Sequence, residues 1–275
     1  MGCSRGFEEE TSNVKARIGA IRLATSFMTT DKFRLWARKQ FSAYSGSVAY
    51  VATKDAEGNH GCGTAFHIGE GVFVTARHVI HGRNSLEIGF DDNSVSQELL
   101  RATKQWRKQS NGSTSIVAGP FFHPDEQVDV ACFKVDPHPA AWIPLGGHLD
   151  HYLGQHELVL HRTLVFGYPP IPCTTEPKLV ASVGEVNALV ELRDQRHPHF
   201  IISTMARGGF SGGPVLVAYN EENEHGGTAV LGIVTQSLMM DGKPAEQGYL
   251  AVLTVEPIFE CLERNNLCPR CQGYD

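Results

Sequence analysis

The sequence predicts an all-β protein with a helical segment at each end. From Ser47 onward, the apolar residues come in short runs rich in Val, Ile, Phe and Thr, and glycines and polar residues separate these runs. Short β-branched runs bounded by turn residues are typical of strands, and 28 glycines in 275 residues supply many turns. With 41% hydrophobic side chains, a chain of this length buries a sizeable core in one or two domains.

Helices are expected at the N-terminal end, over residues 1–45. Between residues 12 and 42, large apolar side chains recur at roughly helical intervals in two stretches, which predicts two helices. Asp31 stands where it can cap the second of them. We therefore interpret residues 1–45 as a helical extension of the β-rich part.

Two groups of strands follow this extension. Residues 46–150 contain the first group, which is interrupted by a polar, charged insertion at 91–115, and residues 151–265 contain the second. The second group ends in a helix predicted over residues 256–264, which has a proline in its first turn. Residues 266–275 form a tail with two cysteines.

The stretch Gly-Gly-Phe-Ser-Gly-Gly-Pro at 208–214 places Ser211 among four glycines. Glycines adopt positive φ and leave the backbone uncovered, so amide N–H groups can converge on one point beside the serine hydroxyl. Such an arrangement forms an oxyanion hole next to a nucleophile. A glycine-rich surface turn is the alternative interpretation of the same seven residues.

Two further segments favour the nucleophile. Thr-Ala-Arg-His at 75–78 ends a run of strand type, which puts His78 where a strand passes into a loop. Asp129 lies inside an apolar run, and a carboxylate buried among such side chains requires hydrogen-bond partners. An imidazole N–H is a suitable partner for it.

His78, Asp129 and Ser211 follow one another in the order in which chymotrypsin-type proteases carry their triad. With its motifs Thr-Ala-Arg-His, Asp-Val-Ala and Gly-Phe-Ser-Gly-Gly-Pro, the chain resembles trypsin/chymotrypsin-fold serine proteases. The resemblance is greater to the disulfide-poor HtrA (Deg)-like branch than to the digestive enzymes. The segment Leu-Gly-Ile-Val-Thr-Gln-Ser at 231–237 resembles the strand that lines their primary pocket. The resemblance covers roughly residues 47–264. It implies two six-stranded antiparallel β-barrels of chymotrypsin type, with the catalytic cleft between them.

The resemblance implies a serine endopeptidase that cleaves polypeptide substrates and needs no cofactor. His78 is expected to take the proton of the Ser211 hydroxyl and return it to the leaving amine, while Asp129 holds the imidazole in the required tautomer. The backbone N–H groups of Gly209 and Ser211 are expected to bind the oxyanion. The acyl-enzyme on Ser211 is then hydrolysed.

The same resemblance implies a primary pocket for the residue before the scissile bond. It places Met205 at the floor of this pocket and Thr235, Gln236 and Ser237 along its wall. No acidic residue stands there to pair with Lys or Arg, which argues against trypsin-like cleavage and favours a small or medium apolar residue. Arg207 is the alternative, because it would attract an acidic residue. An extended peptide is expected to add a strand along the pocket wall.

The residue before the nucleophile suggests how activity is controlled. In relatives that are activated by cleavage, an Asp at this position pairs with the new N-terminus and assembles the oxyanion hole, whereas this chain has Phe210. Phe210 cannot form that ion pair. We therefore expect competence without N-terminal cleavage, with access controlled by the helical extension or by a regulatory protein partner that binds residues 12–42.

Histidines and cysteines offer weaker alternatives as metal sites. His148, His151, His156 and His161 fall in one window, but no cysteine or carboxylate accompanies them at ligand spacing. Cys261, Cys268 and Cys271 supply three thiols without a nearby histidine, which is too few for a closed tetrahedral zinc site. No metal site is predicted.

The seven cysteines indicate a reducing compartment. Seven is an odd number, Cys132 and Cys173 have no evident partners, and Val79 stands where secreted relatives carry the cysteine that would bridge to Cys62. The first ten residues are polar and acidic, unlike a secretory signal. A cytoplasmic protein is therefore expected.

Net charge and hydropathy exclude two further classes. A formal net charge of −6 argues against a nucleic-acid-binding surface, although residues 101–108 are locally basic. No apolar run reaches the ~18 residues that a membrane span requires. Two non-enzymatic functions remain open: a catalytically weak peptide-binding scaffold of the same fold, and an adaptor that acts through its N-terminal helices.

Overall fold

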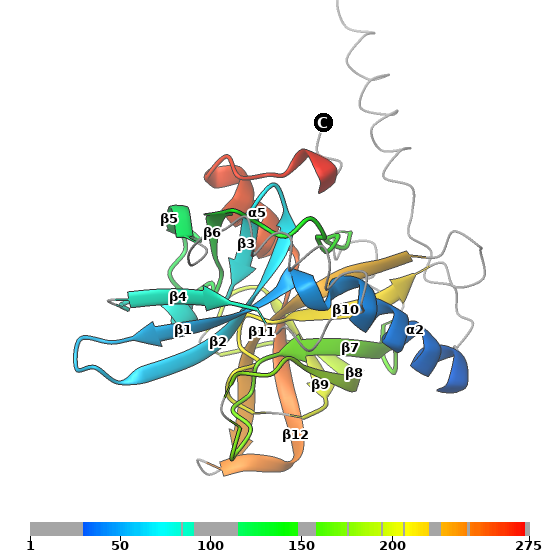
Figure 1. Ribbon diagram of the computed structural model, residues 1–275. Coiled ribbons are helices and arrows are strands. Elements are labelled where there is room, and N and C mark those ends of the chain that lie inside the picture. Colours follow the sequence, from blue (N-terminus) through cyan, green and yellow to red (C-terminus); the bar gives the residue numbers. More distant parts are fainter. Residues whose placement is uncertain are drawn as a thin grey trace, which may run out of the picture.

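The computed structural model of the protein describes residues 30–83, 85–90, 115–147, 158–174, 176–193, 195–205, 207–219, 227–240 and 243–272. The first of the two expected helices, nearly all of the expected insertion, and His148, His151 and His156 lie outside these residues. The described residues form two groups of strands, with a helix at either end of the sequence packed against them (Figure 1).

Six antiparallel strands form the first sheet, in the order β4-β1-β2-β3-β6-β5. Their bounds are Val48–Lys54 (β1), His60–Gly69 (β2), Val72–Thr75 (β3), Ser85–Gly89 (β4), Ser115–Phe122 (β5) and Ala131–Asp136 (β6). Alternate residues of β1, β3 and β6 point into a core that includes Val51, Phe73 and Phe133. The rings of Phe73 and Phe133 stack with their centroids 5.8 Å apart, which fills this core with large apolar groups.

Six further strands form a closed antiparallel barrel, in the order β10-β11-β12-β9-β8-β7. Their bounds are Arg162–Gly167 (β7), Val180–Glu191 (β8), Pro198–Ser203 (β9), Pro214–Tyr219 (β10), Gly227–Met240 (β11) and Lys243–Thr254 (β12). The predicted all-β fold with two six-stranded antiparallel units is therefore confirmed. In the described residues only the second unit is closed by strand pairing, since β4 and β5 remain edges of the first.

Helix α2 (Thr30–Tyr44) confirms the second helix predicted near the N-terminal end. Its buried residues Phe33, Ala37 and Gln40 share one face, as expected at a spacing of three to four residues. The indole Nε1 of Trp36 donates to the Thr228 hydroxyl of β11 at 3.1 Å, so α2 lies against the second barrel (Figure 1). Asp31 stands inside the first turn rather than at the cap, because the helix begins one residue earlier.

Helix α5 (Glu256–Arg264) confirms the predicted closing helix, with Pro257 in its first turn. It contacts β12, which it follows, and also β6 of the first sheet. Beyond it the chain packs onto the first sheet, where the Gln272 amide donates to the Ile68 carbonyl at 2.6 Å. A core cluster containing Phe66, Phe166 and Ile258 joins both sheets to α5. Among the described helices, none combines the length and apolarity that crossing a bilayer requires.

His67 is a buried titratable group at the end of β2. Its Nδ1 lies 2.7 Å from the Ala141 carbonyl, and its Nε2 accepts the Gly71 N–H at 3.0 Å. These two partners require the neutral ring with its proton on Nδ1. Burial lowers the pKa of His67 from 6.5 to about 4.

We predict that His67 makes the fold less stable on acidification. Its folded-state pKa lies below the unfolded value, so its contribution is complete above pH ~6.5 and is lost as pH falls towards ~4. The difference amounts to on the order of 3 kcal/mol. Urea unfolding at pH 7 and pH 5 captures about 2 kcal/mol of this difference, with His67→Gln as the non-titrating comparison. Equal loss of stability in both proteins would contradict the prediction.

Candidate active site

His78 and Asp129 are held together by two hydrogen bonds within the first sheet. His78 lies in the single helical turn α3 (Arg77–Ile80) directly after β3, and Asp129 lies two residues before β6. The Asp129 carboxylate accepts the His78 backbone N–H at 2.9 Å and the ring Nδ1–H at 2.7 Å. Because Nδ1 carries the proton of the neutral ring, Nε2 is left as a proton acceptor.

Exposure differs across this pair. The Asp129 side chain is 13% exposed and the His78 side chain is 50% exposed. The carboxylate is therefore largely screened from water while the imidazole reaches solvent, where a substrate can approach it.

The Ser211 loop, residues 208–213, precedes β10 and is fixed against the first sheet. The Ser211 carbonyl accepts the Thr64 N–H of β2 at 2.8 Å, and the Gly212 N–H donates to the Val234 carbonyl at 2.7 Å. Gly212 has a φ of +83°, and a Cβ there would lie 3.0 Å from the Ala76 nitrogen. The loop therefore lies against Ala76, two residues before His78.

The backbone on the N-terminal side of Ser211 has the form expected of an anion-binding turn. Gly209 has a φ of +93°, and its carbonyl accepts the Thr64 hydroxyl at 2.6 Å. No described residue accepts a hydrogen bond from the N–H of Gly209 or Ser211. Their role as oxyanion donors stays a prediction.

Phe210 is fully buried in the core of the second barrel, with Val165 and Val215 among the members of that cluster. Its carbonyl accepts the Gly213 N–H at 2.8 Å, which closes the turn around Ser211. The side chain before the nucleophile thus anchors the loop by apolar packing.

A cleft of about 700 Å³ adjoins His78 and Asp129. Of the residues expected along the pocket wall, Thr235 and Gln236 line this cleft, whereas Ser237 and Met205 do not. Met205 is 44% exposed at the end of β9. The specificity role assigned to Met205 stays a prediction.

Loop residues that the sequence analysis did not single out line the same cleft. They are Glu126 and Gln127 before Asp129, and Leu192, Arg193 and Gln195 between β8 and β9. Polar loop residues carry no local pattern that marks a binding surface. Arg77 also lines the cleft, and its guanidinium donates to the His123 carbonyl at 3.2 Å.

Comparison with known families decides which fold family this arrangement represents. Residues 63–222, more than half of the chain, match the family model of the trypsin-like peptidase domain. The chain belongs to this family. A trypsin-like peptidase is a hydrolase of peptide bonds, so the predicted class of enzyme is confirmed. The matched region includes all three predicted triad positions.

Solved structures support the trypsin-like fold at low sequence identity. The active form of the Rv3671c protease from M. tuberculosis is 18% identical over 80% of this chain and 81% of that one, with a TM-score of 0.53. The HtrA-type protease AlgW with a tripeptide is 15% identical over 84% and 63%, with a TM-score of 0.57. The serine endoprotease from Yersinia pestis is 16% identical over 82% and 65%, with a TM-score of 0.51. A comparison with curated proteins gave no match.

The cysteines of this trypsin-like peptidase include a contact that the sequence did not indicate. Cys132, which had no evident disulfide partner, is a free thiol whose Sγ lies 3.5 Å from the Cys261 Sγ in the core between β6 and α5. The two residues are far apart in the sequence, so their spacing could not reveal this contact. Cys271, near the C-terminal end, packs against β2, where its thiol donates to the Ile68 carbonyl at 3.6 Å.

Two neighbouring glycines provide a matched test of the loop. A Cβ at Gly209 would lie 2.3 Å from the Tyr168 carbonyl oxygen and would require a strained φ, whereas a Cβ at Gly208 meets nothing within 4 Å. We predict that Gly209→Ala lowers kcat/KM by about 100-fold or more, the effect of losing an oxyanion donor, and that Gly208→Ala stays within a few-fold of wild type. Steady-state cleavage of a peptide substrate measures both. Equal activity of the two variants would argue against this role of Gly209.

Proposed function

We propose that the chain is a serine endopeptidase that forms an acyl-enzyme on Ser211. The observation that carries the proposal is the pair of hydrogen bonds from His78 to the Asp129 carboxylate, at 2.9 and 2.7 Å. A ring held in this way presents an unprotonated Nε2, which is what a general base requires at neutral pH.

Each step of the reaction then has a group to perform it. His78 takes the proton from the Ser211 hydroxyl as the oxygen attacks the peptide carbonyl, and it returns this proton to the leaving amine. Asp129 stabilises the imidazolium that forms between these steps. The N–H groups of Gly209 and Ser211 bind the oxyanion, and one such donor contributes on the order of 3 kcal/mol to transition-state stabilisation. Water, activated by His78 in the same way, releases the acyl group.

The edge of β11 supports binding of an extended polypeptide. β10 pairs with β11 only up to Ile233, and Val234 bonds to Gly213, while Gln236 and Ser237 pair with β12 on the other side. Among the described residues, no strand pairs with the β10 side of β11 from Gln236 onward. A substrate strand added there gains backbone hydrogen bonds that do not depend on its sequence.

The proposal includes a specificity and a mode of control. With Met205 at the pocket floor and Thr235, Gln236 and Ser237 along its wall, the pocket is proposed to take a small or medium apolar residue. Phe210, buried in the barrel core, supports a loop that needs no cut N-terminus to take its active form. A regulatory partner on residues 12–42 fits the outward face of α2, where Leu35 is 71% exposed.

The six cysteines in the described residues are free thiols, which supports the proposed reducing, cytoplasmic compartment.

Fluorophosphonate labelling tests the nucleophile. We predict that the folded full-length protein forms one covalent adduct at Ser211, that Ser211→Ala abolishes it, and that Asp129→Asn slows it by roughly 10⁴-fold because the ring then holds the wrong tautomer. Intact mass and peptide mapping measure the adduct. Absence of labelling in the folded protein, under every partner condition tested, would favour the scaffold or adaptor alternatives.

A second measurement addresses activation. We predict that the uncut chain is labelled as fast as a chain cut near Ser47, because Phe210 anchors the loop without an ion pair. Mass spectrometry of the labelled protein separates the two forms. Labelling confined to the cut form would show that a new N-terminus is needed.

A further inference from the structure

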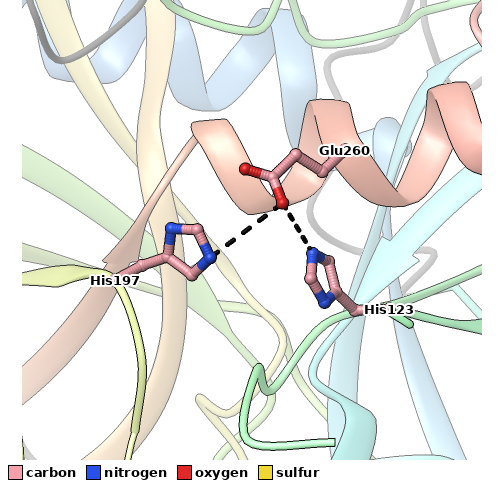
Figure 2. A group of neighbouring side chains, drawn as sticks. All are labelled: His123, His197 and Glu260. Atoms are coloured by element: carbon pink, nitrogen blue, oxygen red, sulfur yellow. Dashed lines mark hydrogen bonds and ion pairs between the residues drawn. The ribbon is translucent and has the colours of Figure 1, made fainter. Parts of the chain in front are cut away.

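Three potential metal ligands meet near the His78–Asp129 pair. His123 follows β5, His197 precedes β9, and Glu260 lies on α5, so the first sheet, the second barrel and the closing helix each supply one side chain (Figure 2). We call these residues the His123 cluster. Their ligand atoms all lie within 4.8 Å of one another.

A single carboxylate oxygen of Glu260 faces both imidazoles. It lies 3.0 Å from Nε2 of His123 and 4.0 Å from Nε2 of His197 (Figure 2). Ligand atoms of a tetrahedral ion with bonds of about 2.0–2.1 Å lie about 3.3 Å apart. The observed separations lie on either side of that value, so small side-chain movements would bring the three atoms onto one ion.

His123 is oriented for this role by its other ring nitrogen. With Nδ1 accepting the Asp125 backbone N–H at 3.1 Å, the metal-free ring carries its proton on Nε2 and donates it to Glu260. A metal on Nε2 requires the other tautomer, in which Nδ1–H donates to the Asp125 carbonyl 3.4 Å away. The His123 side chain is only 3% exposed, so its direction is fixed by packing. Metal-binding histidines are commonly held in this way through the nitrogen that does not bind the metal.

His197 and Glu260 complete the site from the solvent side. His197 adopts a φ of +70°, a backbone conformation that is uncommon for a residue with a side chain and that gathers at ligand-binding positions. The Glu260 side chain is half exposed, which leaves an entry path and room for a water as fourth ligand.

We propose that His123, His197 and Glu260 bind a divalent transition-metal ion, Zn²⁺ in the first place, that joins the two barrels and α5. Two imidazoles and one carboxylate suit Zn²⁺, whereas Ca²⁺ and Mg²⁺ prefer oxygen ligands alone. The neighbouring cation Arg196 is already paired with Asp125 at 3.3 Å, which offsets its repulsion of the ion.

The site reinforces contacts that already cross between the barrels. Beside the ion pair with Asp125, the Arg196 guanidinium donates to the Gln127 amide oxygen at 3.0 Å. The His123 carbonyl in turn accepts Arg77, the residue before His78. An ion bound here therefore stabilises the segment from residue 123 to Asp129 against the second barrel.

The test is a titration of metal-free, full-length protein with Zn²⁺ against a chromophoric chelator. We expect one tight site per chain, weakened by more than about 100-fold in Glu260→Gln and in His197→Asn, since losing even an outer partner of a ligand costs 10–100-fold. Asn is chosen at position 197 because it tolerates a positive φ. Glu263→Gln on the same helix and His60→Ala, an exposed histidine on β2, are the matched controls and should bind like wild type.

Two further readouts separate this site from other possible zinc ligands. Co²⁺ bound to the His123 cluster should give visible d–d bands without thiolate charge-transfer absorption, and the bands should persist in Cys268→Ser/Cys271→Ser and in His78→Ala. Zn²⁺ should raise the midpoint of thermal unfolding in wild type and in Glu263→Gln, but not in Glu260→Gln. A cooperative melting transition of metal-free Glu260→Gln is the control that this variant is folded. Absence of a tight site, unchanged affinity in both cluster variants, or thiolate absorption of bound Co²⁺ would overturn the proposal.

Discussion

Thr64 is the residue through which the two barrels hold the candidate active site together. It is fully buried, and all of its polar groups are used. Its N–H donates to the Ser211 carbonyl and its hydroxyl donates to the Gly209 carbonyl, at 2.8 and 2.6 Å. The same hydroxyl accepts the Tyr168 N–H, and the Thr64 carbonyl accepts the Thr75 hydroxyl. A buried polar group without a partner costs about 1–3 kcal/mol, so losing any one of these bonds would leave an unpaired group at that cost.

The Ser211 loop is therefore supported from two sides. From the first sheet, Thr64 bonds to its carbonyl groups, and the backbone at Ala76 packs against Gly212. From the second barrel, Phe210 fills the space that the missing side chain of Gly167 leaves, since a Cβ there would lie 2.5 Å from the Phe210 ring. In the proposed mode of control, apolar packing and backbone hydrogen bonds perform the ordering that an ion pair provides in cleavage-activated relatives. Neither form of support depends on where the chain begins.

Local pattern was sufficient to predict the strands, the helices α2 and α5 and the candidate triad, because each of these has a signature within a few residues. Asp129, for example, is conspicuous as a carboxylate in an apolar run, and the glycines around the nucleophile are conspicuous by composition. Thr64 carries no such signature, since one threonine in a strand resembles any other until the register with the Ser211 loop is known. The Cys132–Cys261 contact and the His123 cluster could not be predicted from the sequence for the same reason. Their members lie more than sixty residues apart along the chain, and only the packing of α5 on β6 and the loop before β9 brings them together.

The His78–Asp129 pair and Ser211, the proposed nucleophile, differ in what holds them in place. His78 and Asp129 both belong to the first sheet and bond directly to each other, so their geometry survives a small shift between the barrels. The position of Ser211 relative to His78 is sensitive to such a shift. Ser211 belongs to the second barrel and meets the first sheet only through contacts across the interface. Thr64 provides some of those contacts, and Arg196 provides others by bonding to Asp125 and Gln127, four and two residues before Asp129. The His123 cluster lies next to Asp125. Any ligand that tightens or loosens the second group should therefore change the approach of the hydroxyl to the imidazole, and hence the rate of acylation, while the bond between His78 and Asp129 stays intact.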